Sequence, residues 1–207
     1  MNASDREGVI ERLDVSRETI ERLDIYAGLL TRWNPKINLV AKSTLDTLWT
    51  RHFLDTAQIL GLGQGDTWAD LGSGGGFPGV VIALLAAEKQ PGLGMTLVEA
   101  DQRKATFLRT VLRETGVSAR VVCDRIERVP PLGVQTLTAR ALAPLDQLLE
   151  YAERHLAPGG RALFPKGRTA AAEIEDALAR WRFDCQTYPS QTDAEAVVLS
   201  IGDLSRV

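Results

Sequence analysis

The chain has few of the features that mark secreted, metal-binding or membrane proteins. Its only two cysteines, Cys123 and Cys185, stand far apart and without a C-x-x-C or histidine-rich neighbourhood. They indicate neither a disulfide framework nor a metal site, and we expect buried free thiols. No apolar run approaches the ~18 residues of a membrane span, and no basic segment followed by an apolar one opens the sequence. These absences predict a soluble, cytoplasmic protein that binds no membrane.

A positive net charge is also lacking. With 24 lysines and arginines against 27 acidic residues, the formal net charge is −3. This argues against a generic polyanion binder, because nonspecific nucleic-acid affinity needs many neutralised phosphates. Basic residues nevertheless gather in two stretches, which are Arg32, Lys36, Lys42 and Arg51, and then Arg103, Lys104, Arg109, Arg113, Arg120, Arg125 and Arg128. They form either a basic face or solvated helix surfaces paired with Glu114, Asp124 and Glu127, and charge alone favours the second interpretation.

The first third of the chain has a helical pattern. Apolar residues recur at helical spacing between residues 9 and 33, with Ser16 as the expected N-cap, and Asn34-Pro35 is expected to stop the run. A second helix is predicted from Ser43 to Leu60. We therefore predict an N-terminal helical extension over residues 1–65.

Strand and helix patterns alternate from residue 66 onward. A chain of 207 residues with 44% apolar content suits one well-packed core with a modest extension. The alternation predicts an α/β fold, with a mostly parallel sheet covered on both faces and residues 66–207 in one compact unit. Two last strand patterns, at 183–188 and 194–201, predict a terminal antiparallel hairpin. The other predicted elements are strands 67–71, 94–99, 119–123, 134–139 and 160–165, and helices 78–89, 101–115, 144–156 and 169–181.

The most informative segment lies between the first of these strands and its helix. The segment Asp70-Leu71-Gly72-Ser73-Gly74-Gly75-Gly76-Phe77-Pro78-Gly79 places an acid, closely spaced glycines and a proline behind an apolar strand. Glycine permits positive φ and lets a ligand approach the backbone, and Pro78 suits the first helical position because its missing N–H would be unpaired there. We predict that a nucleotide-like cofactor binds at this loop.

Two cofactors fit the loop through different glycines. Gly74-x-Gly76-x-x-Gly79 matches the dinucleotide fingerprint. The register that starts at Asp70, with glycines at 72, 74 and 76, matches instead the D/E-x-G-x-G-x-G loop of methyltransferases that use S-adenosylmethionine (SAM). Glu99, at the end of the next strand, fits ribose hydroxyls in both cases. Asp70 favours SAM, because it could bind the amino-acid end of that cofactor through water or order the glycine turn.

Further candidates follow the remaining strands, because ligands of open α/β sheets bind beyond the carboxyl ends of the strands. Ile126 and Glu127 fall where an adenine would lie. Arg140 directly follows an apolar strand and must emerge at this edge, where it can hold a carboxylate, a phosphate or a base edge. Lys166 and Arg168 follow the fifth strand, either as ligand contacts or as a solvated turn.

A histidine and an aspartate add one more candidate. His52 and Asp55 stand three apart on a predicted helix, where they could form a hydrogen-bonded pair. Such a pair is more often structural than catalytic, and no serine or cysteine nucleophile motif accompanies it. The N/D-P-P-Y/F/W signature of enzymes that methylate exocyclic amines is absent.

Five segments together resemble the RsmG (GidB) family of bacterial 16S rRNA guanine-N7 methyltransferases. They are Arg32–Val40 (RWNPKINLV), Arg51–Thr56 (RHFLDT), Asp70–Gly79, Arg140-Ala141 and Lys166-Gly167. The glycine loop alone identifies only a superfamily, whereas its combination with W-N-x-x-x-N-L and H-x-x-D upstream is much more discriminating. The resemblance implies a class I SAM-dependent methyltransferase with a seven-stranded, Rossmann-like sheet.

The resemblance also implies roles for individual residues. It places SAM contacts at Gly72, Phe77, Ile126, Glu127 and Arg140, which join Asp70, Gly74, Gly76 and Glu99 from the loop itself. Asn34, Asn38, His52 and Asp55 become candidates for shaping the site or the RNA surface, and Lys166 and Arg168 for contacting RNA. The helical extension would form part of the RNA-facing wall, cover one edge of the sheet, or do both.

The implied reaction is methylation of guanine N7 in the conserved 16S rRNA loop near the decoding centre. Guanine N7 carries a lone pair and no proton, so its attack on a sulfonium methyl needs no general base. Catalysis would come from positioning, with Arg140 and Lys166 as the candidates. The expected partner is 16S rRNA or the small ribosomal subunit, with no obligate protein partner. The alternatives are a SAM methyltransferase for a small molecule or protein and a non-catalytic RNA or ribosome assembly factor.

Overall fold

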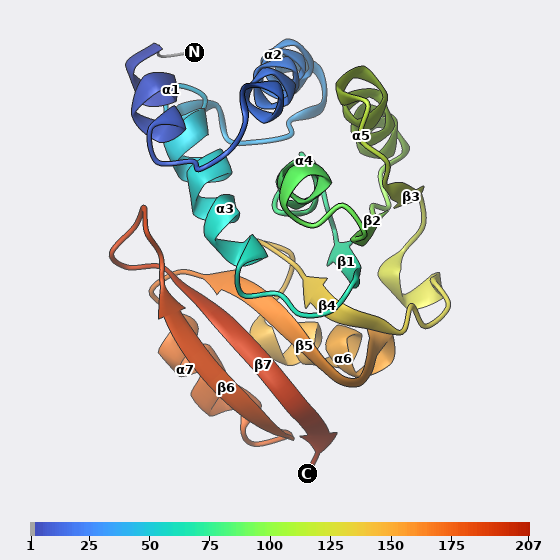
Figure 1. Cartoon of the computed structure of the whole chain (residues 1–207). Helices are drawn as coiled ribbons and strands as arrows, with labels where there is room; N and C mark the ends of the chain where they lie inside the picture. Colours follow the sequence, from blue (N-terminus) through green and yellow to red (C-terminus); the bar gives the residue numbers. More distant parts are fainter. Residues whose placement is uncertain (1–2) are drawn as a thin grey trace.

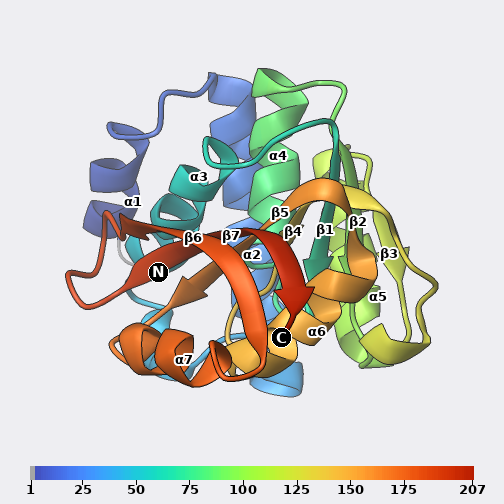
Figure 2. The same cartoon turned by 90° about the horizontal axis from the view of Figure 1, so that it is seen from below.

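The computed structural model describes residues 3–207, which are organised by one seven-stranded sheet of order β3-β2-β1-β4-β5-β7-β6 (Figure 1). β1 to β5 run parallel, and β7 is antiparallel to both β5 and β6. The strands are β1 (Thr67–Leu71), β2 (Gly94–Val98), β3 (Arg120–Val122), β4 (Val134–Thr138), β5 (Leu156–Lys166), β6 (Trp181–Pro189) and β7 (Val197–Arg206). The predicted α/β class with a terminal antiparallel hairpin is confirmed, and Figure 2 shows that hairpin lying at the sheet edge away from β3.

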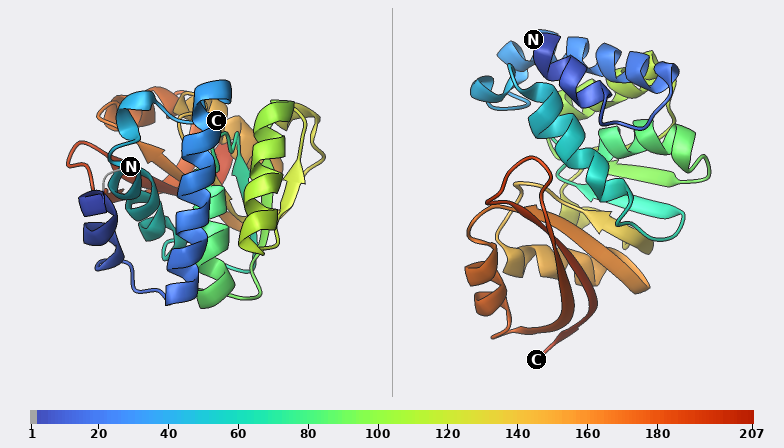
Figure 3. Two further views of the ribbon diagram at one scale, coloured as in Figure 1. Left: turned by 90° about the horizontal axis from the view of Figure 1, so that it is seen from above. Right: turned by 60° about the vertical axis from the view of Figure 1, so that its left-hand side comes forward.

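Helices cover both faces of the sheet. The N-terminal helices, α4 and α5 lie over one face, and α6 and α7 over the other (Figures 1 and 3). The α-helices are α1 (Ala3–Ile10), α2 (Arg17–Ile37), α3 (Asp55–Leu60), α4 (Gly79–Lys89), α5 (Gln102–Thr115), α6 (Leu145–His155) and α7 (Ala170–Ala177). Shorter segments are η1 (Lys42–Thr44), the π-helical η2 (Trp49–Leu54) and η3 (Ile126–Arg128). None of the helices within residues 3–207 is long and apolar enough to cross a membrane.

β1 and β2 each supply side chains to two separate cores. Trp68 belongs to the cluster formed with α4 and the N-terminal helices, and its neighbour Ala69 belongs to the cluster formed with α6. Leu97 and Val98 divide in the same way. Successive strand residues point to opposite faces, so a parallel sheet with both faces covered needs nearly continuous apolar strands. This requirement explains why the strand patterns were readable in the sequence.

The helical extension departs from the prediction at two places. α2 continues through Pro35 to Ile37, and its C-cap Asn38 has φ 51° and donates its N–H to Asn34 O. Pro35 lies in the last turn, where the loss of one N–H donor costs a single hydrogen bond and does not break the helix. The helix predicted from Ser43 to Leu60 is instead divided into η1, η2 and α3.

Three expectations about the core also need correction. α7 is shorter than predicted, because Trp181 pairs with Arg206 in the β6–β7 hairpin instead of continuing the helix. Tertiary pairing here overrides the local helical pattern. β5 begins at Leu156, four residues before the predicted start. Cys123 and Cys185 are free thiols, as expected, but they are half-buried rather than buried.

The extension packs into the same core as α4 and α5. Leu23 and Phe53 share one buried cluster with Val80 and Phe107, and α2 lies alongside α4 and α5 (Figure 3). A second attachment joins α3 to the hairpin. Residues Ser190 and Thr192, in the β6–β7 loop, donate their hydroxyls to the Asp55 carboxylate at 2.8 and 2.9 Å.

Candidate functional site

A cavity of about 420 Å³ lies at the carboxyl ends of β1, β2 and β4. Its volume falls in the range of small-ligand sites. The wall combines the glycine loop after β1, the end of β2, η3 and the loop after β4. The lining residues are Gly72, Gly74, Val98, Glu99, Ala100, Lys104, Arg125, Ile126, Glu127, Ala141, Leu142 and Tyr151.

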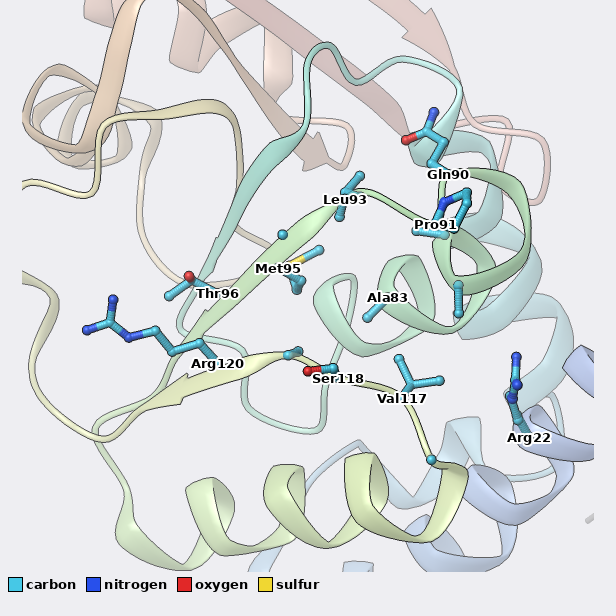
Figure 4. Close-up of a pocket in the computed structure, with 15 residues that line it drawn as sticks. Arg22, Ala83, Gln90, Pro91, Leu93, Met95, Thr96, Val117, Ser118 and Arg120 are labelled. Atoms are coloured by element: carbon cyan, nitrogen blue, oxygen red, sulfur yellow. The ribbon is translucent and has the colours of Figure 1, made fainter.

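A larger cavity, of about 630 Å³, lies at the opposite end of the sheet. Met95, Thr96 and Arg120 line it where β2 and β3 begin, with Gln90 and Pro91 beyond the end of α4 (Figure 4). Open α/β sheets bind ligands at the carboxyl ends of their strands, beside the loops and helix N-termini found there. The 420 Å³ cavity is therefore the candidate cofactor site.

The glycine loop adopts a backbone that other residues would strain. Gly72, Gly74 and Gly76, the three glycines of the register that starts at Asp70, all have positive φ, with values of 65°, 54° and 97°. A Cβ at Gly72 would also lie 2.6 Å from Leu142 Cδ1, and one at Gly76 would lie 2.5 Å from the Tyr26 hydroxyl. Glycine thus permits both the turn and the close packing of this loop.

Asp70 lies behind the glycine loop and does not line the cavity. Its side chain has no exposed surface, and its carboxylate accepts hydrogen bonds from Gly79 N at 3.2 Å and Thr138 Oγ1 at 2.9 Å. Burial raises the pKa of Asp70 to about 6, although these hydrogen bonds oppose the shift. The carboxylate therefore orders the turn, which is one of the two roles that the sequence left open.

Glu99 and Glu127 face the cavity, and both are already hydrogen-bonded. Glu99 is almost completely buried and accepts from Gly74 N at 2.8 Å and Asp101 N at 2.7 Å. Glu127 accepts from the Tyr151 hydroxyl at 2.7 Å, which lowers the pKa of the carboxyl. Tyr151 was missed by the sequence analysis. Its place on the apolar stripe of α6 was a usable signal for burial, but not for contact with Glu127.

Arg140 emerges at the carboxyl edge as predicted and joins the extension there. Its guanidinium lies 5.1 Å from the Phe77 ring centre, and Nη2 lies 2.6 Å from His52 Nδ1. A guanidinium can only donate, so Nδ1 accepts and Nε2 carries the proton that it donates to Thr44 Oγ1 at 3.0 Å. Burial and the Arg140 charge lower the pKa of His52 to about 3, which keeps the imidazole neutral.

The suggested His52–Asp55 pair is not formed. His52 bonds to Arg140 and Thr44, whereas Asp55 bonds to the β6–β7 loop. η2 is π-helical, so the residues in it and after it do not keep the side-chain spacing of a regular α-helix. Each side chain instead joins the extension to a different part of the core.

The remaining candidates lie outside the cavity wall. Asn34 is buried, and its Oδ1 accepts from Leu39 N at 2.7 Å and Val40 N at 2.9 Å. Asn38 caps α2. Lys166 donates its ammonium to Ala143 O at 3.0 Å and Glu173 Oε2 at 2.7 Å, which fixes the loop after β4. Arg168 is exposed, with Nε 3.7 Å from a Glu195 oxygen.

The structure thus divides the predicted cofactor residues into two groups. Gly72, Gly74, Glu99, Ile126 and Glu127 line the cavity, whereas Asp70, Gly76, Phe77 and Arg140 lie beneath or beside the glycine loop. Lys104, Arg125 and Leu142 line it without having been predicted as cofactor contacts. Within residues 3–207, no group of histidine, cysteine, aspartate and glutamate side chains is arranged to hold a metal ion.

Sequence comparisons identify close relatives over almost the whole chain. Residues 19–196 match the family model GidB, described as rRNA small subunit methyltransferase G. The protein called ribosomal RNA small subunit methyltransferase G from Ruegeria sp. (strain TM1040) is 51% identical, and the match covers 99% of this chain and 100% of the relative. The protein with the same name from Methylobacterium nodulans is 45% identical, with coverage of 99% and 98%.

Solved structures of more distant proteins share the fold. A variant of MtNAS in complex with S-adenosylmethionine has a TM-score of 0.59 at 17% identity and covers 87% of this chain and 74% of its own. A putative O-methyltransferase from Klebsiella pneumoniae has a TM-score of 0.57 at 15% identity, with coverage of 97% and 96%.

The buried Asp70 carboxylate predicts a specific pH dependence of stability. The pKa is 3.8 when unperturbed and about 6 in the folded state, so the folded chain binds more protons between these values. The contribution of Asp70 to the unfolding free energy should therefore be greatest below pH 4 and fall by about 3 kcal/mol as the pH rises through 6. Asp70→Asn, which cannot titrate, should remove this contribution.

Chemical denaturation from pH 4 to pH 8 measures the effect. The exposed Asp66→Asn serves as control and should keep the wild-type slope. Equal pH slopes in Asp70→Asn and the wild type would show that Asp70 does not titrate in this range.

Proposed function

Because the chain belongs to the rRNA small subunit methyltransferase G family, we propose that it transfers a methyl group from SAM to N7 of a guanine in 16S rRNA. One observation carries the proposal. The cavity at the carboxyl end of the sheet combines a glycine loop with two acids that already accept hydrogen bonds, Glu99 through both carboxylate oxygens and Glu127 through Oε1. Such a site suits a reaction that depends on positioning and needs no proton acceptor.

The lining residues fit an adenosine-containing cofactor. Glu99 offers a buried carboxylate to ribose hydroxyls, and Ile126 offers an apolar surface to an adenine ring. The glycine backbone at residues 72 and 74 allows close approach at the other wall. When bound, SAM supplies an electrophilic methyl group on a sulfonium sulfur. Asp70, Phe77 and Arg140 act from behind, where they hold the loop and the end of β4 in place.

No side chain is required to remove a proton from guanine N7. His52 is not placed to act as a general base, because both of its ring nitrogens are already hydrogen-bonded, one to Arg140 and one to Thr44. Asp70 is enclosed, and its oxygens accept from Gly79 and Thr138. The residues therefore contribute by fixing the geometry between methyl donor and acceptor, an effect worth up to ~7–11 kcal/mol in favourable systems.

An RNA substrate is supported by a basic edge, defined here as the basic residues of segment 102–128 other than Arg120, which lines the cavity at the opposite end of the sheet: Arg103, Lys104, Arg109, Arg113, Arg125 and Arg128. The segment has only three acids beside these six basic residues, in a chain of net charge −3. Within residues 3–207, Glu114 pairs with Arg113 and Asp101, directly before the segment, pairs with Arg103, but no salt bridge joins an arginine to Asp124 or Glu127. Lys104 and Arg125 also line the cavity. The basic-face interpretation is therefore favoured here, and the rRNA would place the protein in the cytoplasm.

The central test is methyl transfer to RNA. The protein is incubated with methyl-labelled SAM and small-subunit RNA, either free or in 30S particles, and the product nucleosides are mapped by mass spectrometry. We expect label in 7-methylguanosine at one position of 16S rRNA. Transfer to a protein or small molecule without RNA would support the alternative methyltransferase, and tight RNA binding without any turnover would support a non-catalytic assembly factor.

Gly74→Arg tests the cofactor site. Gly74 lines the cavity with φ 54°, so an arginine side chain at this position would intrude on the ligand and strain the backbone. We expect loss of SAM binding in calorimetry while the circular dichroism spectrum stays native. Gly116→Arg is the matched control, because Gly116 also has positive φ and open space but caps α5 away from the cavity. Wild-type affinity in Gly74→Arg would reject the site.

Neutralising part of the basic edge tests the RNA surface. In the double variant Arg103→Gln/Arg109→Gln, the slope of log K for RNA against log salt should fall by about 0.7 for each lost phosphate contact. SAM affinity should stay unchanged. Arg180→Gln/Arg182→Gln removes two exposed charges from the opposite sheet edge, at the start of β6, and should keep the wild-type slope. Equal slopes in both double variants would place the RNA elsewhere.

A further inference from the structure

The N-terminal extension touches the glycine loop through one side chain of α2. Tyr26 has no exposed surface, and its hydroxyl donates a hydrogen bond to Gly75 O. Its ring stacks on Phe77 and Phe53, with centroid distances of 5.4 Å to each. Burial raises the pKa of Tyr26 well above its ordinary value, so the phenol keeps its proton and remains a donor.

A second contact comes from the turn that follows α2. Asn34 Oδ1 accepts from the backbone N–H groups of Leu39 and Val40, which closes this turn. The Leu39 carbonyl then lies directly against Gly75, where a Cβ would approach Leu39 O to 3.0 Å. Gly75 is therefore held by the Tyr26 hydroxyl and by the Leu39 backbone at once.

These contacts act on the side of the loop that is turned away from the cavity. On the cavity side, Gly74 donates its N–H to Glu99 Oε2 at 2.8 Å, and Glu99 is the expected ribose ligand. Two nearby peptide groups of the same loop, 73–74 and 75–76, are thus held by different parts of the chain, one by the acid after β2 and one by the extension. Loss of the Tyr26 hydroxyl would leave a buried carbonyl without its partner, and the loop would shift to find another.

We propose that Tyr26 and Asn34 are cofactor-positioning residues, through which the N-terminal extension sets the loop conformation that binds SAM. Neither residue lines the cavity. The proposal rests on the proposed function only in that SAM binds at the glycine loop. It assigns to the extension a role in cofactor binding, beyond covering the sheet or facing the RNA.

Tyr26→Phe removes the hydroxyl and keeps the stacked ring. We expect SAM to bind roughly tenfold more weakly by calorimetry, since one buried hydrogen bond to the loop is lost. The KM for SAM should rise by a similar factor, while the KM for RNA stays at the wild-type value. A role in packing alone would lower the melting temperature without this split between the two substrates.

Two controls separate positioning from stability. Leu23→Val or Leu23→Ala, whichever matches the melting temperature of Tyr26→Phe, disturbs the same helix without removing a hydrogen bond to the loop. Tyr188→Phe deletes a hydroxyl on β6, where the partner is Gln186. Both controls should bind SAM normally. SAM affinity in Tyr26→Phe within twofold of the wild type, or equal weakening in the Leu23 control, would overturn the assignment of Tyr26.

Asn34 offers a rescue test, because aspartate retains a side-chain oxygen that can accept from Leu39 N and Val40 N. Asn34→Asp should stay close to the wild-type Kd for SAM, and Asn34→Ala should weaken binding several-fold. Equal affinities in the two variants would overturn the role of Asn34. A wild-type protein that binds SAM but does not methylate rRNA would reject the proposed acceptor and leave these comparisons intact, whereas a wild-type protein that does not bind SAM would reject both proposals.

Discussion

Asp70 is an ionisable side chain without exposed surface, and the arrangement of the site depends on its two hydrogen bonds. Gly79 N belongs to the start of α4, and Thr138 is the last residue of β4, so one carboxylate joins β1, α4 and β4. The approach is close enough that a Cβ at Gly79 would lie 2.6 Å from Asp70 Cβ. Residue 79 must therefore be glycine, because any larger side chain would collide with Asp70. A buried acid is costly, and here it fixes the end of β4, from which Arg140 leaves the sheet.

The loop that Asp70 orders is enclosed from several further directions. Leu142 approaches Gly72 from the segment after β4, Glu99 holds Gly74 from the end of β2, and Tyr26 holds Gly75 from the extension. Each contact comes from a different element. The loop is therefore a property of the assembled fold, since the glycines permit its conformation and their neighbours select it. Such prior fixing of a ligand-binding backbone reduces the ordering cost paid on binding.

The sequence predicted those features that depend on local pattern. Apolar strands, the Ser16 cap, the glycine loop and the positions of Glu99 and Arg140 follow from periodicity and residue type. Two of the errors arise from contacts over long sequence separations. Trp181 left its predicted helix to pair with β7, and His52 bonds to Arg140, 88 residues away, instead of Asp55. The roles of Tyr26 and Tyr151 were not predicted. Helical spacing of an aromatic residue predicts that its ring is buried, but it does not predict which group its hydroxyl bonds to.

The same long-range contacts explain why the extension and the core cannot be assigned separate tasks. Tyr26 and Phe53 contribute to the core that also contains α4 and Phe107, and the Tyr26 hydroxyl reaches Gly75 in the candidate cofactor loop. Arg140 links β4 to His52 of the extension, and its guanidinium lies over Phe77 of that loop. Any movement of the extension therefore changes the environment of the loop through side chains that cannot move independently in a close-packed interior. If rRNA contacts the extension, RNA binding and SAM binding are coupled through this shared packing, and by linkage each must change the affinity of the other by the same factor.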